Sequence, residues 1–267
     1  VAACLGVKRM MPSRAAHVSG CLSLALAAVL TFAVRGSAQS PAEAELEFST
    51  GVMHLREGRL DLALNAFKRA VKMDSKNPYF QKGLGQAYAA KRQWRPAIAA
   101  LRKALEINPY FADVKNDLGY ALVMSGDREG GKKEFLSAFG DPMNPAPEIS
   151  AFNLGRAYLE ERNIEQATHW FRTSIARNKS YSAPYIMLAE TLVSTGRLED
   201  AILHLETAVK EMPEEQKNPE LLLALGKAYY KAGRFEEARE PLLETKKADP
   251  LGPFGRAADE QLKALPR

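Results

Sequence analysis

The sequence predicts an all-α solenoid of six helix pairs, and three observations carry that prediction. A unit of about 34 residues recurs from residue 44 to residue 252, and each copy holds two amphipathic runs around a short polar break. Small residues return at the same two places in every copy. No stretch of useful length alternates apolar and polar residues as a half-buried β-strand would. Stacked units of this kind bury one continuous core without a cofactor.

The unit over residues 78–111 is the clearest copy. Its first run places Leu84 and Tyr88 at helical spacing, and Pro109 ends the second run because proline cannot continue a helix. The polar break between the two runs covers residues 91–93. The second run carries one apolar stripe of helical period, made of Ala97, Ile98, Leu101, Ala104, Leu105 and Ile107.

Two columns of small residues set the register of all six units. A glycine inside a helix costs roughly 1 kcal/mol relative to alanine, so its recurrence indicates a close approach of two helices. In the first helix the column advances by 34, 34, 36, 34 and 37 residues through Gly51, Gly85, Gly119, Gly155, Ala189 and Gly226. In the second helix the same steps give Ala63, Ala97, Gly131, Ala167, Ala201 and Ala238. A large apolar residue follows four positions later, as Phe67, Leu101, Phe135, Phe171, Leu205 and Leu242.

This register resembles the tetratricopeptide repeat (TPR) family, whose unit is a helix–turn–helix. The resemblance implies a right-handed superhelix with units at 44–77, 78–111, 112–147, 148–181, 182–218 and 219–252. Residues 253–267 are expected to form a capping helix and tail, because the last repeat would otherwise expose its apolar face. Residues 39–43 are expected to form a short polar linker.

The family resemblance also implies a concave groove lined by the first helices. Its ligand-facing columns supply the groove candidates Tyr79, Lys82, Gln86, Asn116, Tyr120, Phe152, Arg156, Glu190, Lys227 and Tyr230. Aromatic residues with a few charges suit a protein or peptide ligand better than a small metabolite. The residue set with which chaperone-binding TPR domains hold a terminal carboxylate is not reproduced, since Asp117 occupies one of its positions and would repel a carboxylate.

The first helix of the first unit has no preceding neighbour to cover it. Its Phe48, Val52 and Leu55 allow two interpretations. In one, they pack on Phe67 and on the second unit. In the other, they form an exposed apolar patch for a partner or a membrane.

Residues 1–38 have the composition of a secretory leader. They lack acidic residues, begin with a basic region, continue with an apolar run at residues 21–34 and end in the small residues Gly36, Ser37 and Ala38. The pattern predicts a signal peptide cleaved after Ala38, with a retained N-terminal anchor as the alternative. Residues 18–21 resemble a lipidation signal, but they precede the apolar run, so Cys21 is interpreted as part of that run.

Removing this leader changes the charge and the cysteine content. It contains four of the 37 basic residues, which leaves 33 against 32 acidic ones, and it contains both Cys4 and Cys21. The remaining chain is near neutrality, so the composition gives no argument for nucleic-acid binding. It also has no thiol for a disulfide, a metal site or a nucleophile.

The sequence shows no catalytic constellation. His54, His169 and His204 follow the leader, and none has metal-ligand spacing. No phosphate-binding loop or nucleophile elbow is present in the sequence. We therefore expect no enzymatic activity, no cofactor and no metal.

The third unit is the least regular. Gly130 and Gly131 weaken its second helix, and residues 140–147 hold three prolines, which indicates either a hinge or docking loop or a tolerated insertion. With the neighbouring segments 116–120, 135–138 and 152–155, this unit resembles the type IV pilus biogenesis/stability pilotins (PilF/PilW type).

Those pilotins are six-TPR periplasmic proteins that help an outer-membrane secretin to assemble. The resemblance implies an exported, non-enzymatic interaction scaffold in the bacterial cell envelope, with the secretin as partner. The alternatives are a periplasmic or membrane-anchored TPR adaptor for another envelope complex, and a regulator of an enzyme. Membrane contact is expected only through the N-terminal segment, if that segment is retained or lipidated. Pilotins usually carry a lipidated cysteine after the apolar run, and this sequence has none there.

Overall fold

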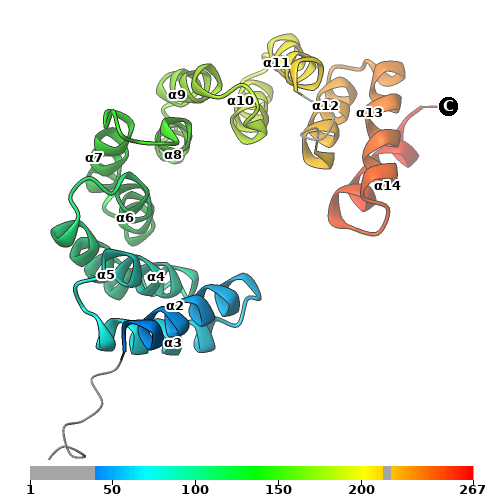
Figure 1. Cartoon of the computed structure of the whole chain (residues 1–267). Coiled ribbons are helices and arrows are strands. Elements are labelled where there is room, and N and C mark those ends of the chain that lie inside the picture. The colour runs from blue at the N-terminus through cyan, green and yellow to red at the C-terminus, as the bar shows by residue number, and fades with distance from the viewer. Residues whose placement is uncertain (1–39, 213–217, 267) are drawn as a thin grey trace, which may run out of the picture.

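The protein folds into an open arc of antiparallel helix pairs (Figure 1). The structure is a computed structural model that describes residues 40–212 and 218–266, and no strand occurs within these residues. The all-α solenoid is therefore confirmed. Its helices are α2 (Pro41–Arg56), α3 (Leu60–Met73), α4 (Pro78–Ala90), α5 (Trp94–Ile107), α6 (Ala112–Ser125), α7 (Arg128–Phe139), α8 (Pro147–Glu160), α9 (Ile164–Arg177), α10 (Ser182–Ser194), α11 (Leu198–Glu211), α12 (Pro219–Lys231), α13 (Phe235–Ala248) and α14 (Pro253–Ala264).

The arc has an inner layer and an outer layer. The first helix of each pair lies on the inner side, and the second helix lies on the outer side (Figure 1). Each second helix also packs on the first helix of the next pair, so the stack is continuous from α2 to α13. This arrangement gathers the even-numbered helices α2 to α12 on one concave face.

The N-terminal helix begins earlier than the sequence pattern predicted. The hydroxyl of Ser40 accepts a hydrogen bond from the Glu43 amide at 3.2 Å, and the Glu43 carboxylate accepts one from the Ser40 amide at 3.0 Å. This capping box starts α2 at Pro41, a residue that fits the first helical position. Residues 41–43 are therefore the first turn of α2 and not part of the expected linker. The predicted leader, residues 1–38, lies outside the described residues.

The small residues of the first helices are the points where the two helices of a pair meet. A Cβ atom added to Gly155 would lie 2.5 Å from Cδ1 of Phe171, and one added to Gly85 would lie 2.6 Å from Cγ of Leu101. Phe171 and Leu101 are fully buried. Because no room exists for a methyl group, the close-packing reason inferred from the sequence for these glycines is confirmed.

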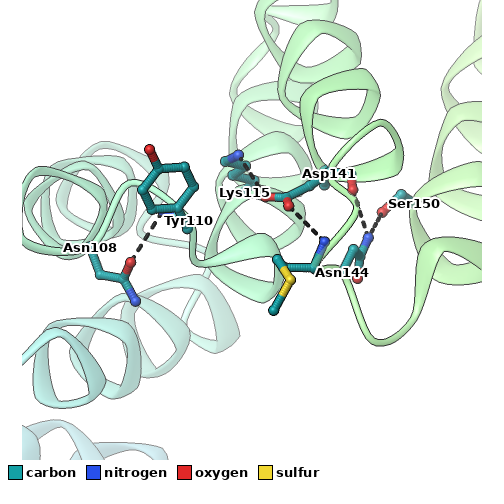
Figure 2. A network of polar contacts seen from close by, with 8 residues as sticks. Asn108, Tyr110, Lys115, Asp141, Asn144 and Ser150 are labelled. Atoms are coloured by element: carbon teal, nitrogen blue, oxygen red, sulfur yellow. Dashed lines mark hydrogen bonds and ion pairs between the residues drawn. The ribbon is translucent and has the colours of Figure 1, made fainter.

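The first four links between the repeats share a hydrogen bond that the repeat pattern does not reveal. An Asp or Asn side chain near the end of the outer helix accepts from the amide two residues later, as in Asn108 with Tyr110 at 3.1 Å (Figure 2). The same bond closes the links at Asp74, Asp141 and Asn178.

The proline-rich third link is held to the repeats on both sides of it (Figure 2). The Asn144 amide group donates to the carbonyl of Ala138 at 2.7 Å and to the hydroxyl of Ser150 at 3.2 Å, and it is buried. The Lys115 ammonium lies 3.3 Å from the Asp141 carboxylate, and both side chains are largely covered. These contacts indicate that residues 140–147 are an insertion held in one position and not a hinge. The helix before the link, α7, continues through both of its glycines because Asp127 caps it.

The C-terminal helix covers the last repeat. Ala258 and Leu265 are buried, and Phe254 packs on the core that extends back to α9. This cover removes an exposed apolar end from the solenoid. None of the helices in the described part of the chain is long and apolar enough to cross a membrane.

Replacing Gly155 by alanine should destabilise the protein by about 1–3 kcal/mol. The added methyl group must displace the buried ring of Phe171, which outweighs the gain of roughly 1 kcal/mol in helix propensity. Urea unfolding followed by circular dichroism measures the effect. The fifth repeat carries Ala189 and Leu205 in the same columns. The double variant Gly155→Ala/Phe171→Leu should therefore lose less stability than the sum of the two single variants. A Gly155→Ala protein as stable as the wild type would contradict this account of packing.

Replacing Asn144 by alanine should cost about 1–3 kcal/mol. The change leaves the buried Ser150 hydroxyl and the Ala138 carbonyl without the amide donor. Hydrogen exchange of the amides in residues 140–150 should become faster, while exchange in α12 should not change. Ser137→Ala, at an exposed position on α7, is the matched control and should leave both quantities unchanged. Equal exchange rates in the wild type and in Asn144→Ala would show that Asn144 does not hold the link.

Candidate functional site

The concave face is the candidate binding surface, and one of its hollows lies near the C-terminus. A hollow of about 560 Å³ lies between α10, α12 and α14. Three predicted groove residues, Glu190, Lys227 and Tyr230, line it. It therefore brings together side chains from two successive repeats and from the capping helix.

The floor of this hollow is apolar and its rim is polar. Val193, Ala224 and Ala228 supply the floor, whereas Lys231 and Gln261 join the predicted residues around the rim. The Tyr230 ring is held in an edge contact with Phe235, with 5.5 Å between the ring centroids. Such a site can bury an apolar side chain of a ligand while the rim pairs with polar groups beside it. The repeat pattern does not reveal Gln261 as a lining residue, because only the turn into α14 brings it beside α10 and α12.

The middle of the concave face is shallower. Tyr120 and Arg156 line a depression of about 10 Å³ between α6 and α8. Phe152 is mainly structural, since its ring packs on Phe171 at 5.9 Å and on Tyr181 at 5.4 Å. The Arg156 guanidinium lies 5.9 Å from the centre of the Phe152 ring. This stretch is a shallow contact surface, against which a ligand side chain can lie without being enclosed.

The N-terminal part of the face carries a polar ladder between α4 and α6. The Lys82 ammonium lies 3.2 Å from the Asp113 carboxylate, and one helical turn further the Gln86 amide donates to Asp117 at 2.8 Å. Lys82 also lies 5.2 Å from the centre of the Phe111 ring, against whose edge the exposed Tyr79 packs. Lys82 and Gln86, both predicted groove residues, are therefore engaged by the next repeat.

One groove candidate is placed differently from the prediction. Asn116 is 8% exposed, so it belongs to the wall between the helices and not to the open surface. Among the described residues, its side-chain oxygen has no hydrogen-bond donor. The position is covered because α6 packs against helices on both of its sides.

The three apolar candidates on α2 pack inward. Phe48, Val52 and Leu55 lie against the core around Phe67, and the Phe48 ring also lies 5.2 Å from that of Phe80. The packed interpretation therefore holds for these side chains. Phe48 and Val52 still line an open hollow of about 580 Å³ along α2, together with Met53.

Comparison with known families decides the class of this protein. Models described as tetratricopeptide repeat match residues 22–78, 54–110 and 192–253, which together cover more than half of the chain. The chain belongs to the TPR family. The first match begins inside the predicted leader, outside the described residues.

Curated relatives are similar over part of their length. Protein CTR9 homolog of Arabidopsis thaliana is 25% identical over 215 residues, which are 78% of this chain and 19% of that protein. The TPR repeat-containing protein PA4299 of Pseudomonas aeruginosa is 30% identical over 150 residues, which are 50% of this chain and 60% of that protein. This TPR chain thus spans less than two thirds of either relative.

Two solved TPR structures are similar over almost their whole length. PilW, titled a widely conserved type IV pilus biogenesis factor, superposes with a TM-score of 0.63 at 21% identity, over 80% of this chain and 96% of that one. Pseudomonas aeruginosa pilF gives a TM-score of 0.62 at 19% identity, over 83% of this chain and 99% of that one. At this identity the likeness shows a shared TPR fold.

Asp117 is a groove carboxylate with a strongly altered proton affinity. Burial between the TPR helices raises the pKa of Asp117 to about 6, against 3.8 for a free side chain. Nearby Lys82 and the Gln86 hydrogen bond act in the opposite direction, and the Asp113 charge adds a smaller upward effect. The ionised carboxylate is therefore held in the folded chain at a cost to stability.

The substitution Asp117→Asn should stabilise the protein at pH 7.5 by about 1–2 kcal/mol. The full change in pKa corresponds to a loss of about 3 kcal/mol in the free energy of unfolding. Partial contact of the carboxylate with water reduces this loss. The folded chain keeps a proton between about pH 4 and pH 6 that the unfolded chain releases, so the cost of Asp117 develops across this range and is constant above it. The stability difference between variant and wild type should therefore shrink as the pH falls from 7.5 to 4. Urea unfolding at both pH values measures it, and a difference that does not vary with pH would contradict the raised pKa.

Proposed function

We propose that this protein is an exported, non-enzymatic scaffold of the bacterial cell envelope that binds a protein segment on its concave face. The hollow between α10, α12 and α14 carries the proposal, because it joins an apolar floor to a charged rim on the face that the TPR stack gathers. Its size suits one or two apolar side chains of a partner, and its open form suits a segment of a larger protein.

We further propose a role in the assembly of a type IV pilus, with the outer-membrane secretin as partner. Support comes from the fold shared with PilW and pilF, and from the irregular third repeat that resembles the pilotins. The leader composition supports export. The adaptor for another envelope complex is the alternative, and the absence of a pilotin-type cysteine favours it.

The substitution Ala224→Arg should abolish capture of the partner without unfolding the chain. Ala224 lies in the floor of the hollow, so an arginine there fills the space and puts a charge where an apolar group should bind. Affinity purification from native envelope extracts after chemical crosslinking, with detection of the secretin by mass spectrometry, measures capture. We expect the amount of captured secretin to fall at least tenfold in Ala224→Arg.

The matched control is Leu243→Arg on α13. This leucine is 52% exposed on an outer helix, so the same residue type is introduced on the convex face. Circular dichroism should show both variants folded, and the control should capture the partner as the wild type does. Absence of the secretin with the wild type would reject the pilus role. Reproducible capture of a different envelope protein, lost in Ala224→Arg only, would support the adaptor.

A further inference from the structure

The polar ladder between α4 and α6 contains two carboxylates. Asp113 forms an ion pair with a cation, and Asp117 forms none among the described residues. Asp113 pairs with Lys82 at 3.2 Å. Asp117, one helical turn further along the groove, receives the neutral Gln86 amide at 2.8 Å. Among the described residues, no lysine, arginine or histidine forms an ion pair with Asp117. The wall therefore holds a surplus negative charge at Asp117.

Hydrogen-bond acceptors also exceed donors at this place. The side-chain oxygen of Asn116, next to Asp117, is buried and has no donor within the described residues. The Gln86 amide reaches Oδ2 of Asp117, and no donor is found for Oδ1 in the described part of the chain. Oδ1 of Asp117 is not a fully buried atom, so a donor from a ligand in the groove can reach it, whereas the Asn116 oxygen is enclosed and cannot contact a ligand.

We infer that the wall formed by Gln86, Asp117 and Tyr120 is a subsite for an arginine side chain of the bound protein segment. This inference rests on the proposed scaffold function and names the chemistry of the partner. A guanidinium has five N–H donors and no acceptor, which matches a place with surplus acceptors and a surplus negative charge. It also stacks on aromatic rings, and Tyr120 is 38% exposed one turn after Asp117.

The Tyr120 ring is fixed in a position suited to this contact. Its edge contact with Trp94 has 6.0 Å between the ring centroids and an angle of 85° between the rings. Arg156 lines the same shallow depression as Tyr120, which marks the end of the subsite, because a second cation would be repelled there. Arginine fits better than lysine, since the ammonium of lysine has three donors on a compact charge and does not stack in a planar manner.

A purely structural ladder would predict a different outcome for the neutral variant. Asparagine at position 117 can still accept from Gln86, so it would join α4 to α6 without the buried charge. A carboxylate that serves only the fold would therefore be replaceable with no loss of ligand binding. If Asp117 belongs to a ligand subsite, Asp117→Asn should fold at least as well as the wild type and should still fail to bind the arginine side chain.

The test is an NMR titration of the purified protein, ¹⁵N-labelled, with Nα-acetyl-L-arginine amide. Its neutral isostere, Nα-acetyl-L-citrulline amide, is the matched probe. At pH 7.5 the arginine probe should shift the amide signals of Gln86, Asp117 and Tyr120 in a saturable manner, and the citrulline probe should bind at least fivefold more weakly. Asp117→Asn should lose the difference between the two probes. Glu244→Gln, which removes an exposed carboxylate on the outer helix α13, should keep it.

Two outcomes would overturn the inference. Equal shifts with both probes would show that the charge is not recognised, and an arginine response retained in Asp117→Asn would place the site elsewhere. Neither outcome depends on capture of the envelope partner. If Ala224→Arg abolishes capture while the arginine response is absent, the scaffold function stands and the subsite is rejected. If the arginine response is present but no partner is captured, the subsite stands and the proposed partner is rejected.

Discussion

The whole structure depends on the close approach of the two helices in each pair. A glycine or an alanine in the first helix faces a large buried side chain of the second, such as Gly155 against Phe171. This contact fixes the distance between the helices, and its repetition fixes how one pair stacks on the next. Because each pair is rotated slightly against its neighbour, the small contact sets the curvature of an arc that gathers one helix of every pair on the inner side (Figure 1).

The same stacking creates a binding surface whose character changes along the arc. At the C-terminal end, α14 closes one side of the space between α10 and α12 and leaves an apolar hollow. Towards the N-terminus the first helices carry polar side chains that pair across repeats, as Lys82 does with Asp113. A ligand that follows the concave face would therefore meet a polar, negatively charged stretch and an apolar one, separated by a flat region.

Stability and recognition are opposed at Asp117. The helix packing that covers this carboxylate also raises its pKa, so the folded chain contains an ionised group that it does not need for its core. The C-terminal helices show the contrasting case, in which the Asp259 carboxylate pairs with Lys246 of α13 and Lys263 of α14 near the surface, where a charge costs the fold little stability. The charge of Asp117 on the inner face costs stability, whereas the charge of Asp259 is balanced by its two lysine partners.

The sequence by itself determined the helix pairs, their register and the inner and outer layers, because every repeat meets the same packing contact and therefore carries the same residue types. It also predicted that Glu190, Lys227 and Tyr230 lie on the concave face, since a helical column is a local property. Tertiary structure decided the rest. The burial of Asn116 depends on helices packed on both sides of α6, and the place of Gln261 depends on the turn into α14. The hydrogen bonds of Asn144 join residues on both sides of an irregular link, so no periodic pattern could reveal them.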